Sequence, residues 1–175
     1  MQTICFSPSS YERLGLEKIG ENLYVSKEDG SVWKERSLYD LGWGREKGYC
    51  RMPELPFEKL IVLAFVIPDD NDIDQKYNYW GSLSVLLDDH CEKLIEYIHN
   101  RICNDASFVS DYKHIIAYID VELNIPDNVI WRLSDKTLQN NCNRWKALRS
   151  SISLDTENSP TKPRKGFFSK LFKRK

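Results

Sequence analysis

The sequence predicts an α+β fold, and three observations support this class. Strand-like and helix-like segments are mixed along the 175 residues, without the strict βαβ alternation of a parallel sheet. Two turn sequences, at residues 29–30 and 126–128, each separate two strand-like runs, as in antiparallel hairpins. A long segment after residue 82 has the apolar spacing of an amphipathic helix. We therefore predict a single domain with a mainly antiparallel sheet packed by two or three helices, followed by a flexible C-terminal tail.

The first third of the chain predicts one helix, one hairpin and one loop. Residues 9–20 begin with two serines and end at glycine, which is typical of a short capped helix. Residues 23–25 and 32–33 flank the Asp29-Gly30 turn and predict a hairpin. Residues 38–56 are interrupted by three glycines and two prolines, so we expect a loop there.

The remaining elements follow from apolar spacing. Residues 59–67 form a nearly continuous apolar run, which predicts a central strand buried on both faces. A helix is predicted from Ser82 to Ile102, with Leu83, Leu87, Cys91, Leu94, Ile95, Ile98 and Ile102 on its buried face. Residues 107–125 fit a helix at first and then alternate, so we expect a strand over 119–125 that pairs with 129–133. A last helix is predicted from Asp135 to Arg149, with Leu138, Cys142, Trp145 and Leu148 forming its buried stripe.

Charge and composition divide the chain into three parts. Seven of the 25 basic residues lie in 161–175, which contains no acid, so the first 160 residues carry 18 basic and 26 acidic side chains. Residues 150–163 are polar, rich in serine and punctuated by proline, as in a linker. We expect an acidic globular domain over 1–149, a flexible linker over 150–163 and a basic amphipathic tail over 164–175, here called the basic tail.

The basic tail has the composition of a membrane-surface helix. Wound as a helix, it gathers three phenylalanines and one leucine on one side, with lysines and arginine around them. In composition it resembles the basic effector segments of peripheral membrane proteins. The residues expected to bind an anionic membrane are Lys165, Phe167, Phe168, Lys170, Leu171, Phe172, Lys173, Arg174 and Lys175. Docking of an F-x-x-L-F helix into a protein groove and contact with nucleic acid are the alternatives, and the acidic body makes nucleic acid the weaker of them.

A second candidate surface combines acids with aromatic rings. Carboxylates follow the apolar run and attract a basic partner, and the nearby rings could anchor it. The residues predicted to bind this partner are Asp69, Asp70, Asp72, Asp74, Tyr77, Tyr79 and Trp80. The acids depart from a calcium-binding EF-hand, which has glycine and glutamate where this chain has Gln75 and Gly81. We predict no metal and no cofactor.

No pattern in the sequence predicts an enzyme. The Walker A, G-x-S-x-G, H-E-x-x-H and G-x-G-x-x-G motifs do not occur, and we name no catalytic residue. His99 shares one helix face with Glu92, Glu96 and Cys103, and this face lies opposite the buried stripe, so we expect it to be exposed. The alternative function is a small hydrolase or nuclease whose site forms only in the fold, from residues such as Asp88, Asp89, His90 and His99.

Together these features predict a cytoplasmic, non-enzymatic protein-interaction module. Five cysteines without a C-x-x-C pair and without a signal sequence favour reduced thiols in the cytosol. The longest apolar run, residues 60–67, is too short to span a bilayer. One concrete version is a bacterial immunity or inhibitor protein, whose acidic surface neutralises a basic toxin domain while the basic tail attaches reversibly to the inner face of the membrane.

Overall fold

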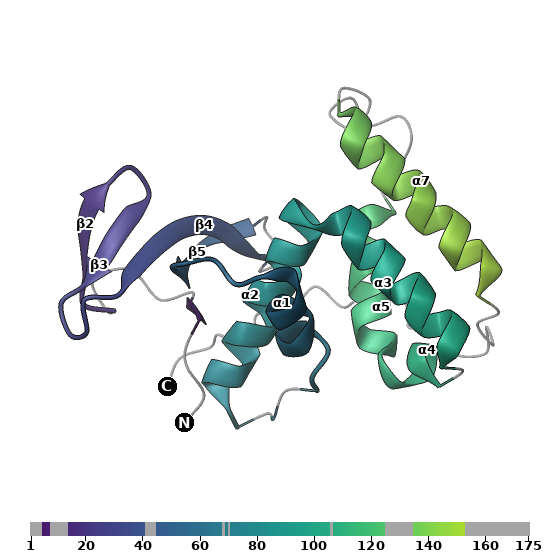
Figure 1. The fold of residues 1–175 in the computed structure, drawn as a ribbon, viewed down its shortest axis with the longest axis horizontal. Helices are drawn as coiled ribbons and strands as arrows, with labels where there is room; N and C mark the ends of the chain where they lie inside the picture. The colour runs from purple at the N-terminus through teal and green to yellow at the C-terminus, as the bar shows by residue number, and fades with distance from the viewer. Residues whose placement is uncertain are drawn as a thin grey trace. The chain divides into compact units, whose positions relative to one another are not determined.

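The computed structural model describes residues 5–7, 14–40, 45–67, 69, 71–105, 107–124 and 135–152. It confirms the α+β class, with a five-stranded antiparallel sheet and helices (Figure 1). By their contacts, the described residues form two compact units, 5–86 and 87–152, which are presented in turn. The basic tail and nearly all of the predicted linker lie outside the described residues.

The sheet lies in the first unit and has the strand order β1-β5-β4-β3-β2. Its strands are β1 (Phe6–Ser7), β2 (Leu16–Gly20), β3 (Leu23–Ser26), β4 (Val32–Asp40) and β5 (Arg45–Arg51), and all neighbours are antiparallel. The predicted hairpin is confirmed, because β3 pairs with β4 and Tyr24 lies opposite Trp33. Gly30 ends the connecting turn with a φ of 70°, a conformation that glycine adopts without strain.

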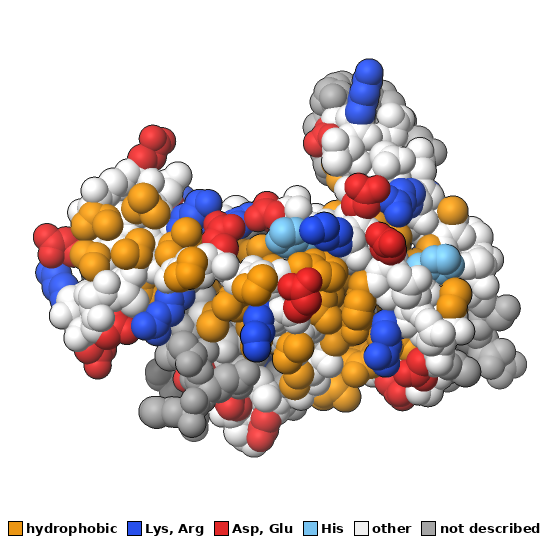
Figure 2. All heavy atoms as spheres, viewed as in Figure 1, with side chains coloured by type: hydrophobic (Ala, Val, Ile, Leu, Met, Phe, Trp, Pro, Cys, Tyr) orange, Lys and Arg blue, Asp and Glu red, His pale blue; other side chains and the backbone are white. Residues whose placement is uncertain are grey.

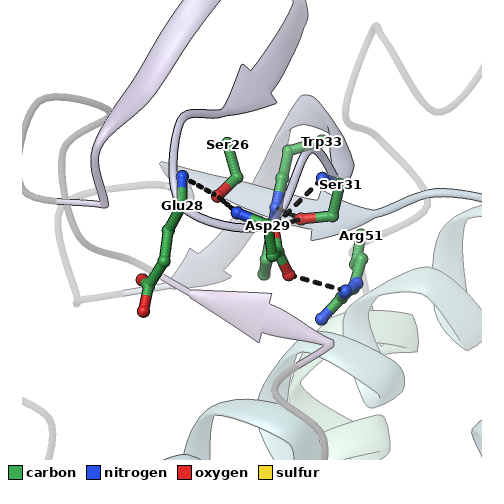
Figure 3. A network of polar contacts seen from close by, with 6 residues as sticks. All are labelled: Ser26, Glu28, Asp29, Ser31, Trp33 and Arg51. Atoms are coloured by element: carbon green, nitrogen blue, oxygen red, sulfur yellow. Dashed lines mark hydrogen bonds and ion pairs between the residues drawn. The ribbon is translucent and has the colours of Figure 1, made fainter.

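A network of polar contacts fixes this turn (Figure 3). The carboxylate of Asp29 accepts hydrogen bonds from the backbone N–H of Ser31 at 3.0 Å and from its hydroxyl at 2.6 Å. These bonds stabilise the charged form and hold the pKa of Asp29 well below its usual range. The other carboxylate oxygen accepts from Arg51 on β5 at 2.8 Å. The Ser31 hydroxyl in turn accepts from the Trp33 indole at 2.8 Å, so the turn is tied to the sheet from two sides.

Two predictions in this region are wrong. The part of the predicted helix 9–20 that is described is the edge strand β2, because its pairing with β3 outweighs a weak helical pattern. Gly15, with a φ of 62°, interrupts a helix at its start. The predicted loop 38–56 contains the end of β4 and all of β5, and Gly48 sits within the ladder opposite Arg36. Glycine favours turns as a statistical tendency, and here strand pairing overrides it.

The predicted central strand 59–67 is also wrong, since this segment forms helix α1 (Phe57–Ala64). Leu60, Ile61 and Ala64 are buried whereas Val62 is 62% exposed, which is the spacing of a helix with one apolar side facing inward. A short apolar run is equally compatible with a buried strand and a buried helix, and the sequence pattern alone does not separate them.

Helix α2 (Ile73–Asp89) holds the N-terminal strand in place. The side-chain oxygen of Asn78 accepts hydrogen bonds from the backbone N–H groups of Cys5 at 2.8 Å and Phe6 at 3.2 Å. Gly81 lets the Phe6 ring approach the helix, because a methyl group at this position would overlap the ring. The single helix predicted over 82–102 is in fact the end of α2 and a separate helix α3, divided at His90, whose φ of −132° is not helical.

The second unit is helical and consists of α3 (Cys91–Asn104), α4 (Phe108–Asp111), α5 (Lys113–Leu123) and α7 (Lys136–Ser151). Its largest fully buried side chains are Leu94, Ile98, Phe108, Ile115, Ile119 and Trp145. The strand predicted over 119–125 is wrong up to residue 123, because α5 continues to Leu123. Val121 is 56% exposed, although it alternates with Ile119 and Leu123, which are buried. The buried residues Ile115, Ile119 and Leu123 are four positions apart, as on one face of a helix. The hairpin predicted with 129–133 loses its first strand, and its second lies outside the described residues.

The last predicted helix is confirmed as α7. The carboxylate of Asp135 caps it by accepting a hydrogen bond from the backbone N–H of Leu138 at 2.9 Å. Of the predicted stripe, Cys142, Trp145 and Leu148 are buried, whereas Leu138 near the start of the helix is only half-buried. The helix continues to Ser151, two residues beyond the predicted end.

Candidate functional site

The predicted acidic surface lies between α1 and α2. We call residues 66–74 the acidic loop. Its described carboxylates, Asp69, Asp72 and Asp74, are all exposed, while Asp70 lies outside the described residues. Ile67 and Ile73 are 71% and 60% exposed and stand beside these acids. The acidic loop therefore presents charge and large aliphatic side chains together.

Hydrogen bonds within the acidic loop hold its shape. Asp72 begins α2 and accepts a hydrogen bond from the backbone N–H of Gln75 at 2.9 Å. Asp69 accepts from the backbone N–H of Asn71 at 2.9 Å, and its own N–H donates to the Gln75 side chain. Asp69 and Asp72 each accept a backbone N–H bond through Oδ1 from a residue two or three positions on, so the two carboxylates are positioned by short-range turns.

The aromatic part of the predicted surface lies differently from the acids. Tyr79 is only 1% exposed and belongs to the core of α2. Trp80 and Tyr77 are half-buried on the same helix, and the Trp80 ring meets Tyr79 edge to face with centroids 4.6 Å apart. Burial raises the pKa of Tyr77, and Asp74 raises it further. Tyr79 is thus not available to a partner, and the aliphatic residues of the acidic loop are the exposed apolar part of this region.

The sequence contained a signal for one of these aliphatic residues. Ile67 was assigned to a buried strand, but a helix that ends at Ala64 leaves it beyond the buried face. A helical interpretation of residues 57–64 places Ile67 beyond that helix. The exposure of Ile73, the first residue of α2, had no comparable signal in the sequence.

The sequence around the acidic loop is poor in basic residues. No lysine or arginine lies between Lys59 and Lys76. Neighbouring carboxylates without local cations produce a negative potential that attracts cationic groups. The geometry suits a ligand with positive charge around an apolar centre.

A second exposed apolar region lies on the sheet. Ile19, Leu23 and Val32, on strands β2, β3 and β4, are 57%, 37% and 36% exposed. Val32 pairs directly with Val25. Figure 2 shows hydrophobic side chains gathered over the β2–β3 hairpin, at the left of the view. This region is apolar but has no charge pattern like that of the acidic loop.

An ionisable cluster in the first unit is centred on Glu35 of β4. Its carboxylate accepts hydrogen bonds from Tyr24 at 2.9 Å, Tyr49 at 3.3 Å and Lys47 at 2.6 Å. The Lys47 hydrogen bond is the main reason that the pKa of Glu35 lies below its usual value. The tyrosines shift the other way: the hydrogen bond to Glu35 raises the pKa of Tyr24, and burial raises that of Tyr49. These side-chain hydrogen bonds join the three strands β3, β4 and β5.

The candidate acid–base residues lie on helix surfaces. Asp88, Asp89 and His99 are exposed, and His90 is half-buried at the junction of α2 and α3. As predicted, the face of α3 that carries His99 is exposed, with Glu92, Glu96 and Cys103 also exposed. Glu92 forms an ion pair with Arg144 of α7.

A small pocket in the first unit has different lining residues. It is lined by Phe6, Arg36, Cys50, Arg51, Glu54, Leu55, Leu60 and Val85. Burial raises the pKa of the Cys50 thiol to about 11, which keeps it protonated and unreactive at neutral pH.

The described residues offer neither a metal site nor a membrane-spanning helix. Among them, no cluster of three or more histidine, cysteine, aspartate or glutamate side chains could hold a metal ion. No helix in the described part of the chain has the length and apolar content needed to cross a bilayer. The residues predicted to bind a membrane, 165–175, lie outside this part.

Comparison with known proteins does not assign the chain to a family. No family model matches it, and neither the search of curated proteins nor that of solved structures gives a match.

Proposed function

We propose that this chain is a non-enzymatic protein-interaction module that binds a basic protein partner through the acidic loop. The single observation that carries this proposal is the exposure of Ile67 and Ile73 beside Asp69, Asp72 and Asp74. Exposed isoleucines are costly in water, and burying them against a partner recovers that free energy.

The composition of the acidic loop suits an interface. Large aliphatic side chains supply a centre that can be desolvated, and charges around such a centre provide specificity and accelerate association. Because the turns of the acidic loop are already hydrogen-bonded, little conformational entropy is lost when a partner binds. One form of this function is a bacterial immunity or inhibitor protein that neutralises a basic toxin domain.

The proposal includes reversible attachment to the cytoplasmic face of a membrane through the basic tail. Its phenylalanines would enter the interface while its lysines and arginines contact anionic headgroups, at about 1 kcal/mol for each basic residue. Co-sedimentation of the full chain with anionic and with neutral vesicles, across a salt series, tests this part. Binding to anionic vesicles that weakens with salt is expected, and equal binding to neutral vesicles would contradict it.

The partner-binding role is tested with two charge-matched variants of the full chain. D69N/D72N/D74N removes three charges from the acidic loop, and asparagine can accept the same backbone hydrogen bonds. E21Q/E28Q/E96Q removes three charges from exposed positions elsewhere. Partners are identified by crosslinking in native lysate with the unmodified chain, and their affinity is then measured for each variant in the presence of excess anionic vesicles, which occupy the basic tail.

We expect the loop variant to weaken partner binding at least about tenfold, the loss of one to two interface ion pairs with cationic groups. The control variant should bind within about twofold of the unmodified chain. Charges outside an interface mainly change the association rate. Equal weakening in both variants would leave only a general charge effect and would contradict a site at the acidic loop. Ile67→Ser provides an independent check, since it removes the apolar contact and leaves the charge unchanged.

A further inference from the structure

We propose that the acidic loop has a partner within the same chain, the basic tail, which docks on it intramolecularly when no membrane is bound. This inference rests on the proposed function of both segments and adds how they regulate one another. Membrane binding would withdraw the basic tail from the acidic loop and open the loop to its protein partner.

Charge complementarity is the first argument. The basic tail has six lysine and arginine residues and no acid. The three described carboxylates of the acidic loop are exposed, and the loop contains no lysine or arginine. Opposite charges of this density attract each other across a contact and orient it, and salt weakens the attraction.

Apolar complementarity is the second argument. The basic tail carries Phe167, Phe168, Leu171 and Phe172 within six positions. The acidic loop offers Ile67 at 71% and Ile73 at 60% exposure, and Val62 of α1 is 62% exposed. Docking would bury the aromatic side chains of the basic tail against the exposed aliphatic side chains of the acidic loop, which favours the docked state. The charged and apolar parts of the two segments therefore match at the same time.

The basic tail and the acidic loop belong to one chain. Residues 152–163 lie between the end of α7 at Ser151 and the basic tail. Docking within one molecule does not depend on protein concentration, whereas docking between two copies does.

The same tail residues would bind the membrane and the acidic loop, so the two contacts exclude each other. If the basic tail is docked about nine-tenths of the time, its apparent membrane affinity falls about tenfold, because only the free fraction can bind. By the same coupling, anionic membrane raises the availability of the acidic loop.

The first measurement uses the full chain without membranes. Limited trypsin cleavage, followed by mass spectrometry, gives the cleavage rate at each lysine and arginine of the basic tail. We compare the unmodified chain with D69N/D72N/D74N and with the control E21Q/E28Q/E96Q. Docking predicts slow cleavage in the unmodified chain and the control, and cleavage about tenfold faster in the loop variant. Equal rates in all three chains would overturn the inference, as would protection that grows with protein concentration, which indicates docking between two copies.

The second measurement separates this inference from the proposed function. Vesicles of phosphatidylcholine with about 30% phosphatidylserine are titrated into the same three proteins. Docking predicts that the loop variant binds about tenfold more tightly than the control. If all three bind equally, the membrane role stands and intramolecular docking is overturned. If none binds but trypsin protection is lost in the loop variant alone, docking stands and the membrane role fails.

Discussion

The sheet and the helical unit are stabilised by different kinds of core. In the helical unit four of the fully buried side chains are aliphatic, Leu94, Ile98, Ile115 and Ile119, and they accompany Trp145 and Phe108. In the sheet, the buried cluster includes Tyr24, Trp33 and Tyr49, and each of these rings carries a polar atom that is hydrogen-bonded at its end. The helical core is mainly aliphatic and has one ring, Trp145, that donates to the Asp120 carboxylate. In the sheet cluster, two of the three rings donate to one carboxylate, that of Glu35.

This difference predicts opposite sensitivities. Loss of buried volume should damage the helical unit most, because a cavity removes both transfer free energy and packing contacts. A change of pH should affect the sheet most, because Glu35 accepts hydrogen bonds from two of its rings. Hydrogen exchange measured by mass spectrometry reports both regions in one experiment, with exchange rates corrected for the intrinsic effect of pH.

The largest effect is expected for Trp145→Ala. The Trp145 ring is 1% exposed in the helical unit, and its indole N–H donates to Asp120 at 2.9 Å. Removing it should cost about 3–5 kcal/mol of unfolding free energy. We expect faster exchange throughout α3, α5 and α7, with the strands β3 to β5 much less affected.

Trp145→Phe serves as the milder variant in case the alanine variant does not fold. It retains most of the buried ring and loses the hydrogen bond to Asp120, so the expected loss is about 1–2 kcal/mol. If the strands exchange as fast as the helices in either variant, the two regions unfold together. Their different cores would then not give them separate stabilities.

The second prediction concerns Glu35→Gln. In the folded chain the pKa of Glu35 lies below its ordinary value of 4.5, so the unfolded chain binds the proton first as the pH falls. The stabilisation is therefore complete above about pH 4.5 and is lost at lower pH as this carboxylate is protonated in the folded state. Glutamine keeps the shape but removes the charge that Lys47 contacts, at a cost of about 1–2 kcal/mol near neutral pH.

Exchange in the sheet should accelerate below pH 4.5 in the unmodified chain and much less so in the Glu35→Gln variant. The helical unit provides the internal reference, and Glu96→Gln, on an exposed face of α3, provides the matched control. A sheet whose acid sensitivity is the same with and without Glu35 would show that other carboxylates control it.

The sequence predicted best where one residue pattern had only one structural solution. Helix α7 has a capping aspartate, a regular apolar stripe and no glycine or proline, and it was located within two residues. The apolar run in α1 fits two structures equally well, and only its neighbours in the fold decide between them. Strands β2 and β5 are short and depend on pairing partners that are distant in sequence, so local propensity could not identify them.

The candidate surface was predicted in part for the same reason. Exposed acids are local features, and Asp69, Asp72 and Asp74 were found from composition alone. Whether a ring or an aliphatic side chain accompanies them depends on which face of α2 is buried, and this buries Tyr79 and leaves Ile73 exposed. Exposure of an apolar residue is a property of packing, which spacing predicts only when the element type is right.

The smallest effect is expected for Asp135→Ala, and it tests whether local signals in the helical unit act locally. The Asp135 carboxylate accepts one hydrogen bond from the backbone of Leu138, so its loss should cost about 1 kcal/mol. Faster exchange should be confined to the first turn of α7, and Asp135→Asn should restore most of the protection because asparagine is an equally good cap. Faster exchange throughout the helical unit would instead mean that the cap contributes to the stability of the whole core. The cap would then matter as much to this unit as Glu35 does to the sheet.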